Sequence, residues 1–203
     1  MLPKITHKYS PNFNNYKRNK SDIKFLIIHY TGMRKEKDAI ERLINIQSEV
    51  SSHYFIKYDG KIIQFVPDLY TAWHAGKSAW RKKKLLNNFS IGIEISNPGH
   101  NHGYKNYNKK QIIALIKLLQ NLKKKYKIKA ENILGHSDIA PVRKKDPGEK
   151  FPWKNLAKKN LSIWHKVNTK ILKKFRREKC DKYEKNLFLK NVSKIGYAKC
   201  KTF

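Results

Sequence analysis

The sequence predicts an α/β fold in which helices flank a mixed central β-sheet. Residues 25–28 and 89–96 form short apolar runs of the kind that make buried strands. Residues 34–48 and 108–126 carry apolar side chains at the spacing of amphipathic helices. Because strand and helix patterns alternate irregularly along the chain, we expect a mixed sheet with flanking helices.

The N-terminal part begins with a polar segment and continues into the first strand. Residues 1–22 are rich in Asn and Lys, and we expect them to form an N-terminal surface arm. After the first strand and helix, residues 52–66 read as a β-hairpin. Asp59 and Gly60 supply the left-handed turn that joins its two arms.

The second half predicts one long helix and a short strand. Residues 108–126 repeat apolar side chains at i, i+3, i+4 and i+7, and Asn108 is a suitable N-cap. Ile133 and Leu134 form a short apolar run that leads into LGHSDIAPVRKKDPGEKFPW (134–153), a stretch without helical or strand periodicity.

The composition changes after Trp153, where the chain becomes strongly basic. Residues 154–179 read as helical, and we place a domain boundary near residue 160. One main domain would then span residues 23–160. Residues 161–203 would form a short, basic, mostly helical C-terminal extension of unknown function, too small to fold around a core of its own.

The charge of the chain is strongly positive. The 203 residues contain 46 Lys and Arg against 15 Asp and Glu, a formal net charge of +31, and 39% are hydrophobic. Such a charge is typical of proteins that bind polyanions. Because Lys, Asn and Ile are abundant throughout, we favour an AT-rich genome as its cause, and expect no specific nucleic-acid partner. A nucleic-acid binder remains an alternative, and would bind in a salt-sensitive way without needing His29 or Asp146.

The sequence gives few signs of a membrane-spanning segment or of an export signal. No apolar run approaches the roughly 20 residues of a membrane span. The N-terminus lacks the apolar segment of a signal peptide, which favours a cytoplasmic location. Cys180 and Cys200 are too few for a disulfide framework, so we expect reduced thiols. We expect a monomer.

Three residues are candidates for a metal site. His29 follows a buried strand, and His136 and Asp146 share one loop that Pro141 and Pro147 stiffen. Two His and a carboxylate with an open fourth position would be a catalytic zinc site. The alternative is a partly buried His29 beside a surface loop in which Asp146 forms a turn, since no local HExxH-type signature is present.

Glu94 is the candidate for proton transfer. It lies in IGIEIS, an apolar strand, and strand alternation places it on the face opposite its Ile neighbours. It is either an outward Glu or a base that faces a cleft. Lys144 is likewise either a cation near the metal or one of many solvated lysines. We expect His53 in the core or behind a ligand, and His100 and His102 in an exposed loop.

Taken in order, these residues resemble the zinc-dependent N-acetylmuramoyl-L-alanine amidases of the type-2 amidase family. The resemblance covers most of residues 20–157, and SPNF (10–13) together with HYTGM (29–33) looks closer to the AmiD-like branch than to the AmpD-like branch. It implies the fold that these enzymes share with phage lysozymes and peptidoglycan recognition proteins. The matching stretches are FLIIHYTGM (25–33), SSHYFIKYDGKIIQFV (51–66), AWHAGKSAW (72–80), NNFSIGIEISNPG (87–99) and LGHSDIAPVRKKDPGEKFPW (134–153).

The resemblance also implies roles for individual residues. His29, His136 and Asp146 fall on the ligands of one catalytic Zn²⁺. Glu94 falls on the catalytic acid/base, and Lys144 on a lysine that stabilises the transition state. The side chains implied in the substrate groove are Trp73, His74 and Arg143.

The implied reaction is hydrolysis of the amide between N-acetylmuramic acid, or its 1,6-anhydro form, and L-alanine of the stem peptide. The substrate would be peptidoglycan or muropeptides, in cell-wall turnover or recycling by a bacterium, and residues 23–160 would be the catalytic domain. The AmiD-like features make the periplasm or cell envelope the alternative location.

Two positions bear on a rival interpretation, a recognition protein without catalysis. In the phage and recognition-protein branch a Tyr stands at the position of Ser52, so here the catalytic role rests on Glu94. That branch also has Cys at the position of Asp146. Non-catalytic relatives lack a metal ligand, whereas all three are present here, which favours the enzyme.

Overall fold

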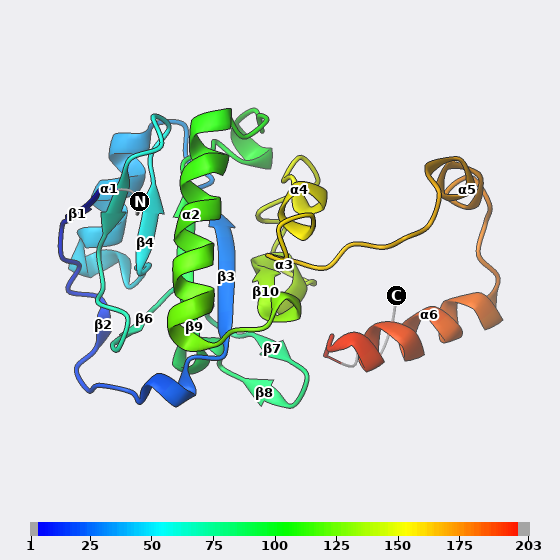
Figure 1. Cartoon of the computed structure of the whole chain (residues 1–203), viewed down its shortest axis with the longest axis horizontal. Coiled ribbons are helices and arrows are strands. Elements are labelled where there is room, and N and C mark those ends of the chain that lie inside the picture. The colour runs from blue at the N-terminus through cyan, green and yellow to red at the C-terminus, as the bar shows by residue number, and fades with distance from the viewer. Residues whose placement is uncertain (1–3, 199–203) are drawn as a thin grey trace.

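The computed structural model describes residues 4–198 and has a six-stranded sheet at its centre (Figure 1). Four neighbouring strands are parallel, and the β4–β5 pair is antiparallel, so the sheet is mixed as predicted. In spatial order the strands are β1 (Ile5–His7), β5 (Ile62–Gln64), β4 (Tyr54–Ile56), β9 (Ser90–Ile95), β3 (Phe25–Tyr30) and β10 (Ile133–Gly135).

Helix α2 (Lys109–Tyr126) covers one face of the sheet (Figure 1). Asn108 caps it as predicted: its side chain accepts a hydrogen bond from the Gln111 backbone N–H, and its own backbone N–H donates to the Gln111 side-chain oxygen. Its apolar side packs on the largest core cluster, which includes Leu26 and Ile28 of β3. Because strand side chains alternate, His29 points to the opposite face.

The opposite face is covered by shorter elements. Helix α1 (Glu36–Ile44) buries Ala39 and Leu43 against Phe55 of β4. Helix α3 (His136–Ile139) follows β10 directly, and its Ile139 packs with Phe25 and Ile27. Two short ribbons lie outside the main sheet: β2 (Phe13–Asn14) with β6 (Thr71–Ala72), and β7 (Ala79–Trp80) with β8 (Lys83–Lys84).

The predicted hairpin forms between β4 and β5. Lys57 donates its backbone N–H to the Lys61 carbonyl across the turn. Gly60 adopts a left-handed φ of 85°, and a Cβ there would lie 2.9 Å from the Lys110 carbonyl oxygen. Glycine is therefore required at this turn both by backbone conformation and by the close approach of α2.

The N-terminal segment differs from the expected surface arm. Strand β1 pairs in parallel with β5 and extends the central sheet. Asn12 is fully buried, and its amide donates to the carbonyls of Asn45 and Val50. Arg18 is 7% exposed and donates to the carbonyl of Asp68. Asn12 and Arg18 are polar because they satisfy buried backbone carbonyls, whereas most other side chains of residues 4–22 are exposed.

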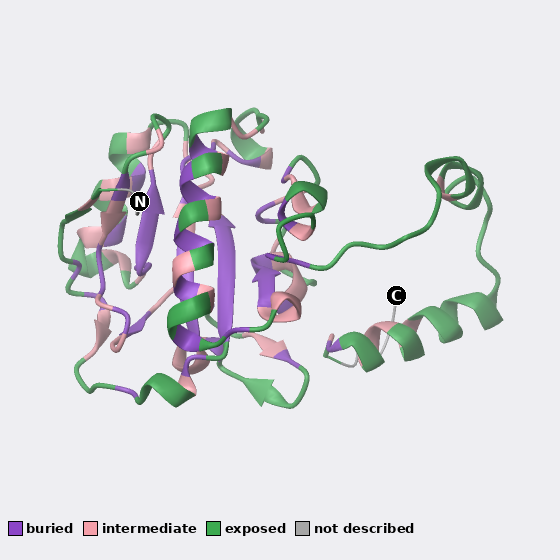
Figure 2. Cartoon of the chain, viewed as in Figure 1, coloured by how far each residue is buried: buried purple, intermediate pink, exposed green. Residues whose placement is uncertain are grey.

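The C-terminal part is less helical than expected over residues 154–179. Helix α4 (Trp153–Ala157) is short, and the chain has no helix from 158 to 168. Helices α5 (Thr169–Phe175) and α6 (Lys182–Ile195) follow and are largely exposed (Figure 2). Cys180 is exposed, and Cys200 lies outside the described residues. Within residues 4–198, no helix combines the length and apolar character needed to span a membrane.

Candidate metal centre and active site

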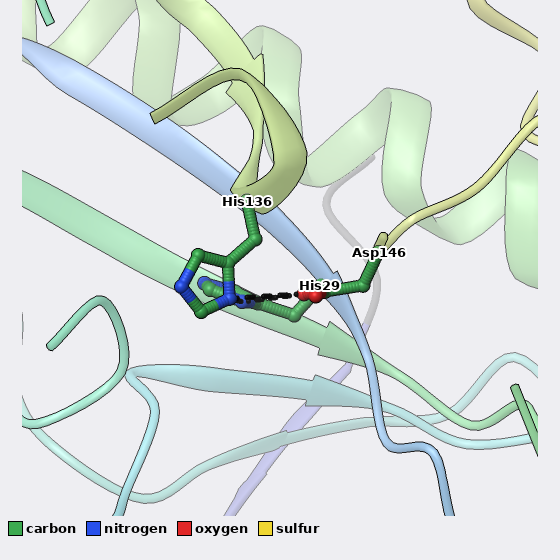
Figure 3. A group of neighbouring side chains, drawn as sticks. All are labelled: His29, His136 and Asp146. Carbon is green, nitrogen blue, oxygen red and sulfur yellow. Dashed lines mark hydrogen bonds and ion pairs between the residues drawn. The ribbon is translucent and has the colours of Figure 1, made fainter. Parts of the chain in front are cut away.

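Three residues distant in sequence meet at the carboxyl ends of parallel strands (Figure 3). His29 lies near the end of β3, His136 begins α3 directly after β10, and Asp146 projects from the loop beyond α3. Ligands of α/β folds commonly bind at this edge of a parallel sheet. All three side chains are buried, with residue exposures of 1%, 3% and 6% respectively.

The donor atoms form a nearly equilateral triangle. His29 Nδ1 lies 2.9 Å from His136 Nδ1 and 3.0 Å from Asp146 Oδ2, and His136 Nδ1 lies 3.1 Å from the same oxygen. Tetrahedral zinc bonds of about 2.0–2.1 Å put neighbouring ligand atoms about 3.3 Å apart. The spacing and chemistry of this cluster therefore fit a metal ion. Among residues 4–198, no other group of His, Cys, Asp and Glu has this arrangement.

A chain of hydrogen bonds behind His29 determines which of its nitrogens can bind a metal. The Ser90 hydroxyl donates to the Leu86 carbonyl at 2.6 Å, so Ser90 Oγ accepts from His74 Nε2–H at 3.1 Å. Neutral His74 then accepts at Nδ1 from His29 Nε2–H, across 3.0 Å. His29 Nδ1 is consequently unprotonated and directed at the other two ligands.

Gly92 of β9 makes room for this arrangement. A Cβ at position 92 would lie 2.4 Å from the His74 ring.

Burial, followed by the nearby charge of His136, lowers the pKa of His29 to about 4, and burial also lowers the pKa of His74. Both rings are therefore neutral at physiological pH, the state that metal ligation requires.

His136 is oriented in a comparable way. Its Nε2–H donates to the Ala75 carbonyl at 3.1 Å, which leaves Nδ1 for a metal. The guanidinium of Arg143 donates to the same carbonyl and to that of Lys77 at 2.7 Å. Arg143 thus fastens the 75–77 backbone beside the ligand. Partners of this kind commonly fix the orientation of metal-bound imidazoles.

The Asp146 loop is held by backbone and phenol contacts. Ser137 N–H donates to the Asp146 carbonyl at 2.8 Å, and the hydroxyls of Tyr104 and Tyr107 both donate to the Pro147 carbonyl at 2.7 Å. Burial by itself would raise the pKa of Asp146, but the proximity of the His136 and His29 rings more than offsets burial and holds the pKa below its usual value. The carboxylate is therefore ionised and ready to ligate a cation.

Glu94 occupies the same cavity as these ligands. It pairs in register with His29 across β9 and β3, so both side chains point to one face. The cavity has a volume of about 420 Å³ and is lined by the three candidate ligands together with Trp73, Glu94 and Lys144. The enclosed Oε2 of Glu94 has no hydrogen-bond partner within residues 4–198. A buried carboxyl oxygen without a partner lowers the stability of the fold, so its presence beside a candidate metal site indicates a functional role for Glu94.

The environment of Glu94 favours its protonated form. Burial is the main cause, and the Asp146 carboxylate adds to it, while Lys144 opposes both; together they raise the pKa of Glu94 to about 8. A carboxyl group whose pKa lies near neutrality can both accept and donate a proton, as general acid–base catalysis requires.

This raised pKa predicts a pH-dependent stability. Between about pH 4.5 and 8 the carboxyl ionises in the unfolded chain but stays protonated in the folded one, so stability falls as pH rises. Glu94→Gln removes this loss. In metal-free protein we expect the melting temperature of Glu94→Gln, relative to wild type, to be about 7–14 °C higher at pH 8 than at pH 5, corresponding to about 3–4 kcal/mol. Calorimetry at the two pH values measures this, and an equal difference at both would contradict it.

The three side chains predicted in a substrate groove all line the cavity, and each also has a structural contact. Trp73 donates from Nε1 to Asn14 of β2 at 2.7 Å, so the N-terminal segment positions it. His74 lies behind His29, and Arg143 lies against backbone carbonyls. Contact of these residues with substrate stays a prediction.

Several supporting residues were not found from the sequence. Ser90 and Ala75 orient the candidate ligands through hydrogen bonds, and the hydroxyls of Tyr104 and Tyr107 hold the Asp146 loop through the Pro147 carbonyl. Gly92 is the one sequence feature that indicates such support, because a glycine inside a buried strand often marks the close approach of another group. His53 lies in the core, where its Nδ1 accepts from Gly92 N–H.

Comparison with known proteins agrees with this geometry. The sequence profile of a family described as N-acetylmuramoyl-L-alanine amidase matches residues 19–149. The chain is 43% identical over 155 residues to the N-acetylmuramoyl-L-alanine amidase AmiD of Escherichia coli, covering 70% of this chain and 55% of AmiD. It is 34% identical over 162 residues to the 1,6-anhydro-N-acetylmuramyl-L-alanine amidase AmpD of Haemophilus influenzae, covering 71% of this chain and 85% of that one.

Solved structures show the same similarity. The complex of Escherichia coli AmiD with anhydro-N-acetylmuramic acid-L-Ala-D-gamma-Glu-L-Lys aligns with a TM-score of 0.74 at 32% identity, over 94% of this chain and 77% of that one. AmpDH3 of Pseudomonas aeruginosa in complex with anhydromuramic pentapeptide aligns with a TM-score of 0.76 at 30% identity, over 94% and 79%. The chain spans little more than half the length of some curated relatives, 55% of AmiD and 54% of Enterobacter cloacae AmpD.

Proposed function

Because this chain belongs to the N-acetylmuramoyl-L-alanine amidase family, we propose that it hydrolyses the amide between N-acetylmuramic acid and L-alanine. Peptidoglycan or muropeptides, including those with the 1,6-anhydro sugar, would be its substrates, and residues 23–160 its catalytic domain. The observation that carries the proposal is the cluster of His29, His136 and Asp146 beside the unpartnered carboxyl of Glu94. The substrate and pentapeptide in the complexes of the two solved relatives support this choice of bond.

We propose one Zn²⁺ as the metal. His29 and His136 would bind it through Nδ1 and Asp146 through Oδ2, the atoms that already converge. Three protein ligands leave one position open, as in catalytic rather than structural zinc sites. When bound there, zinc would supply Lewis acidity and make a water more acidic.

Glu94 would move the protons of the reaction. In its ionised form Glu94 accepts a proton from the attacking water, and it then returns that proton to the departing nitrogen of L-alanine. Because Glu94 pairs with His29 across β9 and β3, its carboxyl group lies in the cavity beside the candidate metal ligands. Lys144 lines the same cavity and would stabilise the negative charge that develops on the lactyl carbonyl oxygen.

The charge of the cavity rim suits an anionic substrate. Four cations line it: Arg42, Arg143, Lys144 and Lys145. The stem peptide carries carboxylates, which such a rim would attract and orient. Trp73 offers an apolar face beside the ligands, suited to the sugar or the lactyl group.

Product analysis tests the proposed function directly. Incubated with intact sacculi or with anhydro-muropeptides, the protein should release free stem peptides that begin with L-alanine. A chelator should reduce this release at least about 100-fold and added zinc should restore it, because the open metal site is needed for chemistry. Mass spectrometry identifies the cleaved bond. Binding of muropeptides without cleavage, in zinc-loaded protein, would instead identify a recognition protein.

A further inference from the structure

The C-terminal extension leaves the main domain after α4 and returns to it at the end of α6 (Figure 1). The return is made by Gly196 and Tyr197. Arg81 donates its backbone N–H to the Gly196 carbonyl at 2.5 Å. The Tyr197 ring packs edge-on against Trp80 of β7, with ring centroids 4.9 Å apart. The extension is therefore fastened to the domain at its far end, although most of α5 and α6 is exposed (Figure 2).

The Tyr197 hydroxyl reaches a carboxylate that belongs to the metal-site turn. It donates to Asp138 Oδ1 at 2.5 Å, while Asp138 Oδ2 accepts from the Gly135 backbone N–H at 2.7 Å. Gly135 is the residue directly before the candidate ligand His136. One carboxylate thus joins the returning tail to the backbone that presents a ligand.

Close packing leaves this connection little freedom. A Cβ on Gly196, whose φ is 146°, would lie 2.7 Å from the Trp80 ring. A Cβ on Gly135 would lie 2.7 Å from the ring of Pro147, which follows Asp146. Gly135 is therefore packed against the loop that carries Asp146, and its backbone N–H is held by the Asp138 carboxylate. A change at Tyr197 can therefore alter the positions of His136 and Asp146 through a short series of direct contacts.

We propose that Tyr197 is a positioning residue for His136 and acts through Asp138, which makes the C-terminal extension part of the support of the metal centre. The inference rests on the proposed zinc site. Loss of a partner that contacts a ligand directly weakens metal binding about 10–100-fold. Tyr197 is separated from His136 by Asp138 and the Gly135 backbone, so we expect its loss to weaken zinc binding about tenfold, at the lower end of that range.

The test compares Tyr197→Phe with Tyr183→Phe in the full-length protein. Both changes remove one phenol hydroxyl from the extension, but Tyr183 is 73% exposed on α6. Zinc affinity is measured by competition with a chromophoric chelator. Tyr197→Phe should raise the zinc Kd about tenfold, and Tyr183→Phe should leave it unchanged. Equal Kd values for Tyr197→Phe and wild type would overturn the inference, whatever happens to the melting temperature.

A double-mutant cycle with Asp138→Ala identifies the route, because alanine removes the oxygen that accepts from Tyr197. If Tyr197 acts through Asp138, the double variant should bind zinc about as weakly as Asp138→Ala alone, since the Tyr197 contribution is already lost. Effects on log Kd that simply add would overturn the proposed route. Absence of zinc binding in wild type would instead overturn the proposed function itself, so the two failures are distinguishable.

Discussion

Asp146→Ala is expected to abolish both zinc binding and amide hydrolysis. Its carboxylate oxygen lies 3.0 and 3.1 Å from Nδ1 of the two histidines, so its removal leaves two of the three proposed ligands. Loss of an indirect partner alone weakens zinc sites by about 10–100-fold, so loss of a ligand should exceed 100-fold. Metal content by mass spectrometry and turnover of anhydro-muropeptides, both at micromolar zinc, measure the effect.

Asp38→Ala is the matched control for this variant. Asp38 is an exposed aspartate on α1, and its replacement removes the same charge without touching the cavity. It should keep full metal content and turnover. Stoichiometric zinc in Asp146→Ala together with retained turnover would show that Asp146 is not a ligand and that the metal-site assignment is wrong.

Glu94→Gln is expected to keep zinc and lose most turnover. Glutamine preserves the shape of the side chain but cannot exchange the proton that the reaction needs. General acid–base groups contribute about 10²–10⁴-fold to rate, so kcat should fall within this range. Because Glu94 is not among the clustered ligands, the zinc Kd should change little. Steady-state kinetics with equal zinc loading separates this effect from metal loss.

The control for Glu94→Gln is Glu41→Gln, an exposed residue on α1 whose partner is Lys37. It should leave kcat unchanged. Wild-type turnover in Glu94→Gln would remove Glu94 from the mechanism, and the base would then have to be sought elsewhere in the cavity. A parallel fall in zinc content would indicate that Glu94 supports the metal rather than the proton transfer.

Local patterns in the sequence were enough for the elements whose stability is local. Helix α2 begins after Asn108 and ends at Tyr126, as the apolar spacing and the N-cap predicted. The β4–β5 hairpin forms around Gly60 because a left-handed turn needs that residue. Both signals come from neighbours along the chain, where backbone hydrogen bonding and side-chain periodicity are directly readable.

Local sequence patterns predicted the candidate site only in part. The residue pattern suggested that His29, His136 and Asp146 could share a metal, and the family resemblance assigned them roles. Their distances and the position of Glu94 beside His29 come from parallel strand pairing, which joins Glu94 to His29 across 65 residues and β10 to β3 across more than a hundred. No local rule specifies which strands become neighbours.

By itself, the sequence determined the fold class, the long capped helix, the hairpin and the identity of the chemical groups. The tertiary structure alone decided that Ile5–His7 extends the sheet and Asn12 is buried, that His74 supports His29, and that Tyr197 reaches Asp138. The physical reason is that a polar side chain looks solvated in sequence, whereas its burial depends on a partner supplied from far along the chain.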